Sequence, residues 1–307
     1  MNKVKSFLSK LNSMSPAAKA SFWFVVSNVV LKGISFITTP IFTRMLDVAD
    51  YGISSVFVTW EGVISIFATL SLAGGVYNVA MTKYEKDVET LTSSLIGLSA
   101  LSSILVYVVC IGINAIFPQL FGLSVGYLIF MWIQTFTNIS TTFWLMRKRY
   151  TYDYKKVIAY TFTNAILSPV VAIIAVRLVE DNKAYAKVIG SGLWGIIVGV
   201  VIMAMLIYKG KKLYHKEYWK YALKFNVPLL PHYLSQVMLN SLSSMGIYVS
   251  AGSACAKGHR SDVLTSMGVS PAGIDSAIRI SLSKFTTEND MDLLYNGIVE
   301  TINRVRR

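Results

Sequence analysis

One short stretch combines residue types that nucleophilic chemistry uses. Residues 250–259, "SAGSACAKGH", set Cys255 in a run of small residues, followed closely by Lys257, His259 and Arg260. The thiolate is the reactive form of cysteine, and neighbouring cations favour it. The pattern therefore indicates an electropositive loop that presents a nucleophile. The alternative is a stranded, oxidisable thiol. No metal-ligand spacing or cysteine framework is present.

A second group of candidates consists of charges inside apolar runs. Lys32 and Glu61 interrupt two such runs, and Arg44 stands at the end of the first. A charge at mid-membrane depth is costly and usually functional, so we predict a polar cavity that receives a charged, hydrophilic substrate. The alternative is that Lys32 and Arg44 extend their charged ends to the interface while Glu61 neutralises Lys32 or lies near an interface. Pro40 predicts a kink in the first run.

Composition places these residues in a membrane protein. The chain of 307 residues is 54% hydrophobic and only 15% charged, with a mean hydropathy of +0.53, whereas soluble domains carry about 25% charged residues. The net charge of +13 could indicate nucleic acid. The cations, however, stand at the ends of apolar runs, as in the loops of membrane proteins. We expect membrane lipid, and no nucleic acid, as a partner.

Six stretches are long and apolar enough to cross a bilayer, which takes about 20 residues. They cover residues 21–43, 53–80, 92–117, 125–146, 157–179 and 188–208. The connections between them are short, so neighbouring helices should run antiparallel. The sequence therefore predicts an all-α polytopic bundle of about six transmembrane helices.

The loop charges predict the orientation of this bundle. Lys and Arg gather in the N-terminal arm and in residues 83–86, 147–156 and 209–224, which are alternate loops. The opposite side carries fewer cations, namely Arg44, Arg177, Lys183 and Lys187. Since cytoplasmic loops hold the excess of positive charge, we expect the N-terminus and the C-terminal tail to be cytoplasmic.

The pattern changes after residue 225. The stretch 225–252 begins like a further helix with Pro228 and Pro231 at its start, then turns to Ser, Gly and Asn. Farther on, "GIYVS" and "DSAIRISLS" predict strands, and "SDVLTSMG" predicts a short helix. Residues 286–307 predict an amphipathic helix with Thr287 as N-cap and Asp290 three residues later. The tail therefore reads as a small α/β unit.

The first part of the chain resembles a family of exporters. "LKGISFITTPIFTRMLDVADYGISSVF" (31–57) and "FNVPLLPHYLSQVMLNS" (225–241) are similar to the first and seventh helices of Wzx-type, O-antigen-translocase-like flippases of the multidrug/oligosaccharidyl-lipid/polysaccharide exporter (MOP) superfamily. The resemblance implies export of undecaprenyl-pyrophosphate-linked oligosaccharide units across the bacterial inner membrane, for surface polysaccharides such as lipopolysaccharide. It also implies a central cationic cavity, with Lys32 and Arg44 at motif positions.

The chain departs from that family in holding one bundle over residues 1–241. Exporters of this kind rock one bundle against the other around a site between them. We therefore expect impaired transport by this chain alone, unless a second copy or a partner half-transporter supplies the opposite wall.

The tail resembles a different family. "GIYVSAGSACAKGHRSDVLTSMGVSPAGIDSAIRISLSKFTTENDMDLL" (246–294) is similar to the C-terminal end of NifS/IscS-type cysteine desulfurases, which are class V aminotransferase-like enzymes of PLP-dependent fold type I. The resemblance implies that Cys255 stands at the persulfide position and Arg279 at the substrate-carboxylate position. It also implies pyridoxal phosphate, whose lysine belongs to a domain that residues 1–241 do not contain. Both positions should then be vestigial, and we expect no cofactor unless that domain is supplied in trans.

The combined interpretation is a chimera. Residues 1–241 would form the half-exporter bundle and residues 242–307 a desulfurase C-terminal fragment, with the seam near 239–245. A transporter-like, non-enzymatic role is preferred because it covers most of the chain. An inactive cysteine desulfurase and a non-transporting membrane adaptor that displays the tail remain as alternatives.

Overall fold

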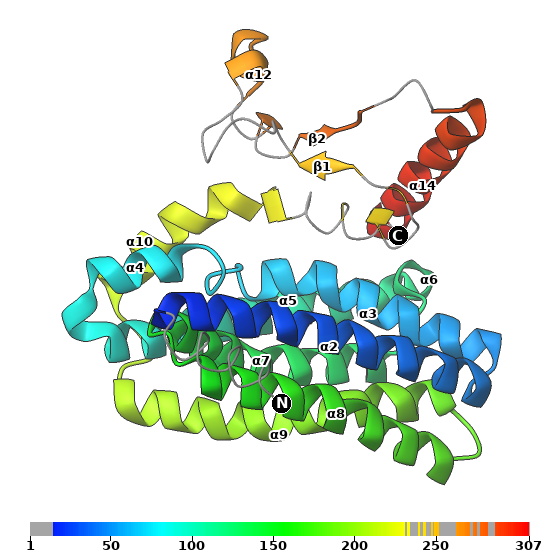
Figure 1. The fold of residues 1–307 in the computed structure, drawn as a ribbon, viewed down its shortest axis with the longest axis horizontal. Coiled ribbons are helices and arrows are strands. Elements are labelled where there is room, and N and C mark those ends of the chain that lie inside the picture. The colour runs from blue at the N-terminus through cyan, green and yellow to red at the C-terminus, as the bar shows by residue number, and fades with distance from the viewer. Residues whose placement is uncertain are drawn as a thin grey trace, which may run out of the picture.

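The fold is known from a computed structural model and is mainly helical. The structure describes residues 15–230, 232–233, 239, 242–243, 247, 249–251, 262–270, 273–274, 277–281 and 286–306. Within these residues, long helices form one bundle, and the short strands and remaining helices of the tail lie outside it (Figure 1).

Six long helices make up the bundle in the part of the chain that the structure describes. They are α2 (Pro16–Met45), α3 (Val48–Ala68), α5 (Val88–Ile116), α7 (Val125–Tyr150), α8 (Tyr154–Leu178) and α9 (Lys183–Gly210). Short elements connect or follow them: α4 (Val76–Lys83), η1 (Glu85–Asp87), α6 (Pro118–Phe121), α10 (Lys216–Asn226) and η2 (Val227–Leu229). This order confirms the predicted helical bundle.

Among the described residues, five helices are long and apolar enough to span a membrane; four match predicted spans, and the fifth, Val48–Ala68, covers only part of the predicted 53–80. The five are Ala18–Met45, Val48–Ala68, Glu85–Ile116, Tyr154–Leu178 and Lys183–Gly210. The stretch predicted over 125–146 forms α7, which is 26 residues long but is not among these five. The reason is its polar content: Thr135, Ser140 and Thr141 are buried, and α7 packs against both α5 and α9. We infer that α7 is the interior helix of the bundle, whose polar groups face protein rather than lipid.

The prediction of one continuous helix over 53–80 is wrong. Helix α3 ends at Ala68, and the chain turns through residues 69–75 before α4 begins at Val76. Leu70 and Ser71 have positive φ angles of 51° and 47°, a left-handed conformation that cannot continue a helix. A break of this kind leaves backbone N–H and C=O groups without helical partners, so other groups must satisfy them inside a membrane protein.

A single side chain from far along the sequence satisfies this break. Asn226 is fully buried; its Oδ1 accepts a hydrogen bond of 2.9 Å from the backbone N–H of Val76, and its Nδ2 donates to the carbonyl of Leu70. A Cβ atom at Gly75 would overlap the Asn226 amide and lie 2.5 Å from the Tyr233 hydroxyl. Gly75 is therefore required for the amide to reach both sides of the break.

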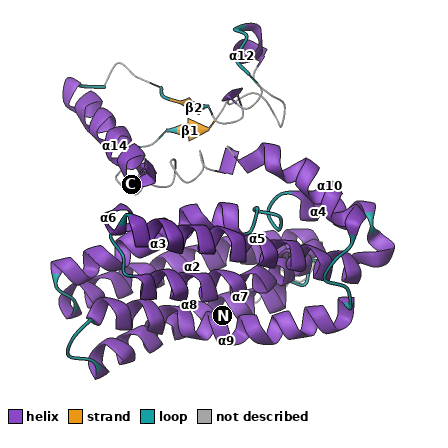
Figure 2. Ribbon diagram, turned by 180° about the vertical axis from the view of Figure 1, so that it is seen from behind, coloured by secondary structure: helices purple, strands orange, loops and turns teal. Residues whose placement is uncertain are grey.

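Helix α10 holds Asn226 in place. The α10 and α4 helices lie side by side (Figure 2). Tyr218 donates a 2.7 Å hydrogen bond to the Asp87 carboxylate, and the Trp219 indole donates to the carbonyl of Ser94 at 2.9 Å. Burial and the neighbouring carboxylate raise the pKa of Tyr218, so its hydroxyl keeps its proton and remains a donor.

Glycines let α9 approach its neighbours closely. A Cβ atom at Gly190 would lie 2.6 Å from the Ala172 Cα of α8, and one at Gly199 would lie 2.7 Å from the Thr137 carbonyl of α7. Real Cβ atoms do not approach so closely, so larger residues would push these helices apart. Helix α9 thereby ties α7 and α8 together, as small residues commonly do between membrane helices.

The tail has the element types that the sequence predicts, in shorter form. Strands β1 (Ser250–Ala251) and β2 (Ile278–Arg279) pair antiparallel, with Ser250 opposite Arg279. Helix α12 covers Asp262–Ser266 and α14 covers Glu288–Arg306. In both views these elements lie outside the bundle (Figures 1 and 2). The two-residue strand pair and the two helices do not show the predicted α/β fragment of a PLP-dependent enzyme.

The predicted cap of the last helix is confirmed. The Thr287 hydroxyl accepts from the Asp290 N–H at 3.3 Å, and the Asp290 carboxylate accepts from the Thr287 N–H at 2.9 Å. These reciprocal bonds form a capping box. The backbone hydrogen bond from Thr287 lowers the pKa of Asp290, since it favours the charged carboxylate.

We predict that Asn226→Ala destabilises the bundle by about 3 kcal/mol, because two buried backbone groups lose their partner. Denaturation of the purified full chain in detergent micelles would measure the change in unfolding free energy. The matched control is Asn78→Ala, an exposed asparagine on α4, which should change stability by less than about 0.5 kcal/mol. Equal stability of the two variants would contradict a stabilising role for the two hydrogen bonds of Asn226.

Candidate functional site

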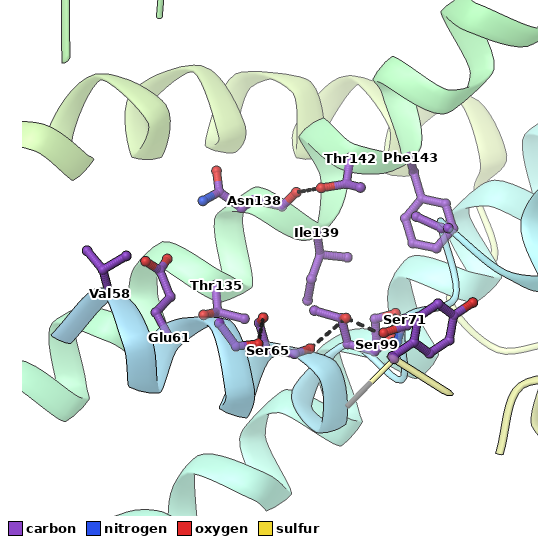
Figure 3. Close-up of a pocket in the computed structure, with 15 residues that line it drawn as sticks. Val58, Glu61, Ser65, Ser71, Ser99, Thr135, Asn138, Ile139, Thr142 and Phe143 are labelled. Atoms are coloured by element: carbon purple, nitrogen blue, oxygen red, sulfur yellow. Dashed lines mark hydrogen bonds between the residues drawn. The ribbon is translucent and has the colours of Figure 1, made fainter. Parts of the chain in front are cut away.

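The main cavity lies beside the break in the second span. It has a volume of about 540 Å³ and is lined by residues of α3, α5 and α7, by the turn at 69–75, and by Tyr233. Figure 3 shows Glu61 and Ser65 on one helix facing Thr135 and Asn138 on the other. The break therefore shapes one end of the cavity, as interrupted helices do in transporter binding sites.

Hydroxyl and amide groups dominate the polar lining of this cavity. The Ser65 hydroxyl donates to the Gly62 carbonyl at 3.0 Å, Thr142 donates to Asn138 at 2.8 Å, and Ser99 donates across helices to Thr69 at 3.1 Å. Each hydroxyl oxygen keeps acceptor capacity after donating its proton. The lining therefore offers acceptors suited to water or to the hydroxyls of a sugar.

Glu61 is the one candidate residue that the structure brings to this cavity. Its carboxylate accepts a 2.8 Å hydrogen bond from the Gln134 Nε2 of α7. The Oε1 of the same amide is buried without a hydrogen-bond partner among the described residues. No ion pair joins Glu61 to Lys32 in the described part of the chain, so the structure does not support their mutual neutralisation. A role for Glu61 in binding stays a prediction.

Lys32 and Arg44 lie elsewhere. Both side chains are exposed on α2, and neither belongs to the lining of the main cavity. The structure therefore does not gather the three charged candidates into one site. A charge within an apolar run reveals its depth in the membrane but not the face of the helix on which it lies.

The structure describes one of the two tail candidates. Cys255 and its loop lie outside the described residues, so its proposed role stays a prediction. Arg279 is exposed on β2. No group of three His, Cys, Asp or Glu side chains among the described residues could hold a metal ion.

The polar face of α7 is the feature that the sequence analysis missed. Gln134, Asn138 and Thr142 recur every four residues, a spacing that places them on one face of a helix. This spacing was visible in the sequence and could have identified the cavity wall. Ser99 and the turn residues carried no such signal, because their position depends on how α3 and α5 pack.

Comparison with known proteins defines the class of protein. Residues 17–258 match the family described as polysaccharide biosynthesis protein. The match covers most of the chain, so the chain belongs to this family. Together with five helices able to span a bilayer, this makes it a helical membrane protein of polysaccharide biosynthesis.

A second similarity covers a shorter part of the chain. It is 37% identical over 73 residues to cysteine desulfurases of Nostoc sp. (strain PCC 7120 / SAG 25.82 / UTEX 2576) and of Trichormus azollae. The alignment covers 23% of this chain and 18% of each relative, so the chain spans under a fifth of their length. This partial match is compatible with a desulfurase-like tail but does not establish the chimera. No solved structure matches the chain.

We predict that Glu61 and Gln134 are energetically coupled. A double-mutant cycle with Glu61→Ala and Gln134→Ala, read as unfolding free energy in detergent, should give a coupling of about 1 kcal/mol, since a side-chain hydrogen bond joins the two residues. The parallel cycle with Glu61→Ala and Lys32→Ala should give no coupling. Coupling in the second cycle and none in the first would indicate that Glu61 interacts with Lys32 rather than with Gln134.

Proposed function

We propose that this chain takes part in flipping undecaprenyl-pyrophosphate-linked oligosaccharide units across the bacterial inner membrane, as in O-antigen export. The observation that carries the proposal is the cavity of about 540 Å³, whose lining combines hydroxyl and amide groups with apolar side chains, inside a helical membrane bundle of the polysaccharide biosynthesis family. A sugar needs such polar groups, because each of its hydroxyls loses hydrogen bonds to water on entering the membrane.

The proposed mechanism uses the cavity as one wall of the transport site. Glu61, held by Gln134, and the amide of Asn138 would bind sugar hydroxyls. The turn at 69–75, fixed by Asn226, would keep the end of the cavity open. We propose that a second copy or a partner half-transporter supplies the opposite wall, and that transport by the bundle of residues 1–241 alone is impaired. The cytoplasmic location of the N-terminus and the tail is part of the proposal.

The direct test is restoration of surface polysaccharide in a strain that lacks its own flippase. We predict that Glu61→Gln lowers restoration about tenfold, because an N–H donor replaces one of the two carboxyl oxygens and 1.4 kcal/mol corresponds to tenfold. The matched control is Glu180→Gln, an exposed residue outside the cavity, which should restore polysaccharide as the unchanged chain does. Restoration by Glu61→Gln at the full level would contradict the role of the cavity.

A second candidate function is favoured by the partial similarity to cysteine desulfurases. We propose that residues 242–307 derive from such an enzyme and that Cys255 and Arg279 are vestigial. The described tail, a two-residue strand pair with Arg279 exposed on it, does not fit a bound pyridoxal phosphate, so we derive no step through that cofactor. Incubation of the purified chain with pyridoxal phosphate, cysteine and dithiothreitol, which as reductant would free sulfide from a persulfide, should yield neither a protein-bound aldimine band nor sulfide. Sulfide release that Cys255→Ser abolishes would establish the enzyme instead.

A further inference from the structure

Three segments that are rich in cations meet at one end of the bundle. They are residues 83–89, 147–156 and 209–224. Hydrogen bonds join them: the Tyr84 hydroxyl donates to the Glu217 carboxylate at 2.9 Å, and the Arg147 guanidinium donates to the Glu89 carboxylate at 2.7 Å. Figure 2 shows α4 and α10 together at this end. The structure thus gathers the basic segments that the sequence assigns to one side of the membrane.

Cations outnumber carboxylates at this end of the bundle. The three segments hold 13 Lys and Arg residues and five Asp and Glu residues. Four of the five carboxylates already have a partner in an ion pair or a hydrogen bond, namely Asp87, Glu89, Asp153 and Glu217. The positive charge of this end is therefore not balanced within the three segments.

Helix α10 presents part of this excess charge on one face. Lys216, Lys220 and Lys224 recur every four residues, and all three are exposed. Positions four apart differ by about 40° around a helix, so the three side chains form one stripe, the lysine stripe. The ion pairs of the described residues include none of these three lysines. Each ammonium group therefore keeps N–H donors for a group outside the chain.

Apolar side chains share this face of α10. Leu223 is 37% exposed, and Val227, which directly follows the helix, is 48% exposed. Each lies three residues after a lysine of the stripe, a spacing that makes the two side chains neighbours on a helix surface. In a membrane, the carbon chain of a lysine lies along lipid while its ammonium group reaches the headgroups. A face that combines lysines with apolar side chains therefore fits the boundary between headgroups and hydrocarbon.

The opposite face of α10 fixes the helix to the bundle. Tyr218 and Ala222 are buried, and the Trp219 indole donates to the carbonyl of Ser94 on α5. Asn226, at the end of the same helix, bonds to both sides of the break in the second span. The lysine stripe consequently has a fixed direction, away from the bundle, and a ligand on it would act on the helix that supports the break.

The lysine stripe lies near the ends of the spans. The span of α9 ends at Gly210 and that of α5 begins at Glu85. Helix α10 begins at Lys216, soon after the first of these ends, and packs against α5 and α4. This places the stripe at the level where lipid headgroups meet water. Basic segments at that level attract anionic lipids, whose charge complements theirs.

We propose that the exposed face of α10 binds anionic lipid headgroups of the surrounding leaflet, with the three lysines of the stripe as the binding cations. This partner is a lipid of the membrane and not the cargo of transport, so the inference does not depend on the proposed function. Because α10 carries Asn226, bound lipid would also stabilise the break beside the main cavity. The competing interpretation is that the lysines act only during insertion, by keeping this end in the cytoplasm.

The test measures lipid binding to the purified full chain in detergent micelles by native mass spectrometry. The probes are phosphatidylglycerol, which is anionic, and phosphatidylcholine, which is zwitterionic, with the same acyl chains. We expect phosphatidylglycerol to bind at least about tenfold more tightly, since three cations attract its headgroup. Equal binding of the two lipids would overturn the proposal and favour a role in insertion alone.

Variants separate the lysine stripe from the general charge of this end. Changing all three stripe lysines to Gln should remove the preference for phosphatidylglycerol, and changing them to Arg should retain it. The matched control changes Lys86, Lys155 and Lys209 to Gln, which removes the same charge from exposed positions at the same end. This control should keep the preference. Equal loss in the control and in the Gln variant of the stripe would overturn the assignment to α10.

Stability gives a second readout of the same binding. A lipid that binds only the folded chain raises the midpoint of thermal unfolding. We expect phosphatidylglycerol to raise this midpoint by about 3 °C in the unchanged chain and in the control, but not in the Gln variant of the stripe. Far-UV circular dichroism before heating verifies that each variant is folded. An equal rise in the Gln variant would contradict binding at the stripe. If that variant does not fold, the lipid preference of the unchanged chain and of the control still decides the proposal.

Discussion

The hydrogen bonds that Asn226 makes across the broken second span are the constraint on which the rest of the structure depends. A helix interrupted inside a membrane needs partners for the backbone groups that it frees. Here one buried amide serves both sides, accepting from Val76 and donating to Leu70. Because Asn226 lies at the end of α10, the contact ties the chain after the bundle to the wall of the main cavity, 150 residues earlier in the sequence. The cavity, the break and α10 therefore form one connected arrangement.

This arrangement explains how a largely apolar bundle can hold polar surface in its interior. The hydroxyls of Ser65 on α3 and Thr142 on α7 donate to backbone carbonyls, so both are paired even without a ligand. Glu61 is held by Gln134 rather than by a cation, which leaves its remaining acceptor capacity for a ligand. Two cations, Lys187 and Arg149, lie instead against aromatic rings, outside the lining of the main cavity.

Local patterns in the sequence predicted the features that depend on neighbouring residues. Hydropathy predicted the long helices, and the Thr287–Asp290 spacing predicted the capping box that forms. The break at 69–75 escaped prediction because residues 53–80 stay apolar and the amide that stabilises the break comes from Asn226. Lys32 and Arg44 show the same limit: their charge was evident, but the face of α2 on which they lie is set by packing against α8 and α3. Gln134 and Asn138 could have been found from their four-residue spacing.

The most direct test is the water accessibility of the main cavity in the membrane. A Ser65→Cys variant, in a chain whose Cys110 and Cys255 are changed to Ser, would be treated with a membrane-impermeant thiol reagent and compared with Val108→Cys, which lies 64% exposed on the outside of α5. Labelling at position 65, none at 108, and loss of labelling when Asn226→Ala is added would support a water-accessible cavity held open by the hydrogen bonds of Asn226. A cysteine at 65 as unreactive as one at 108 would contradict it.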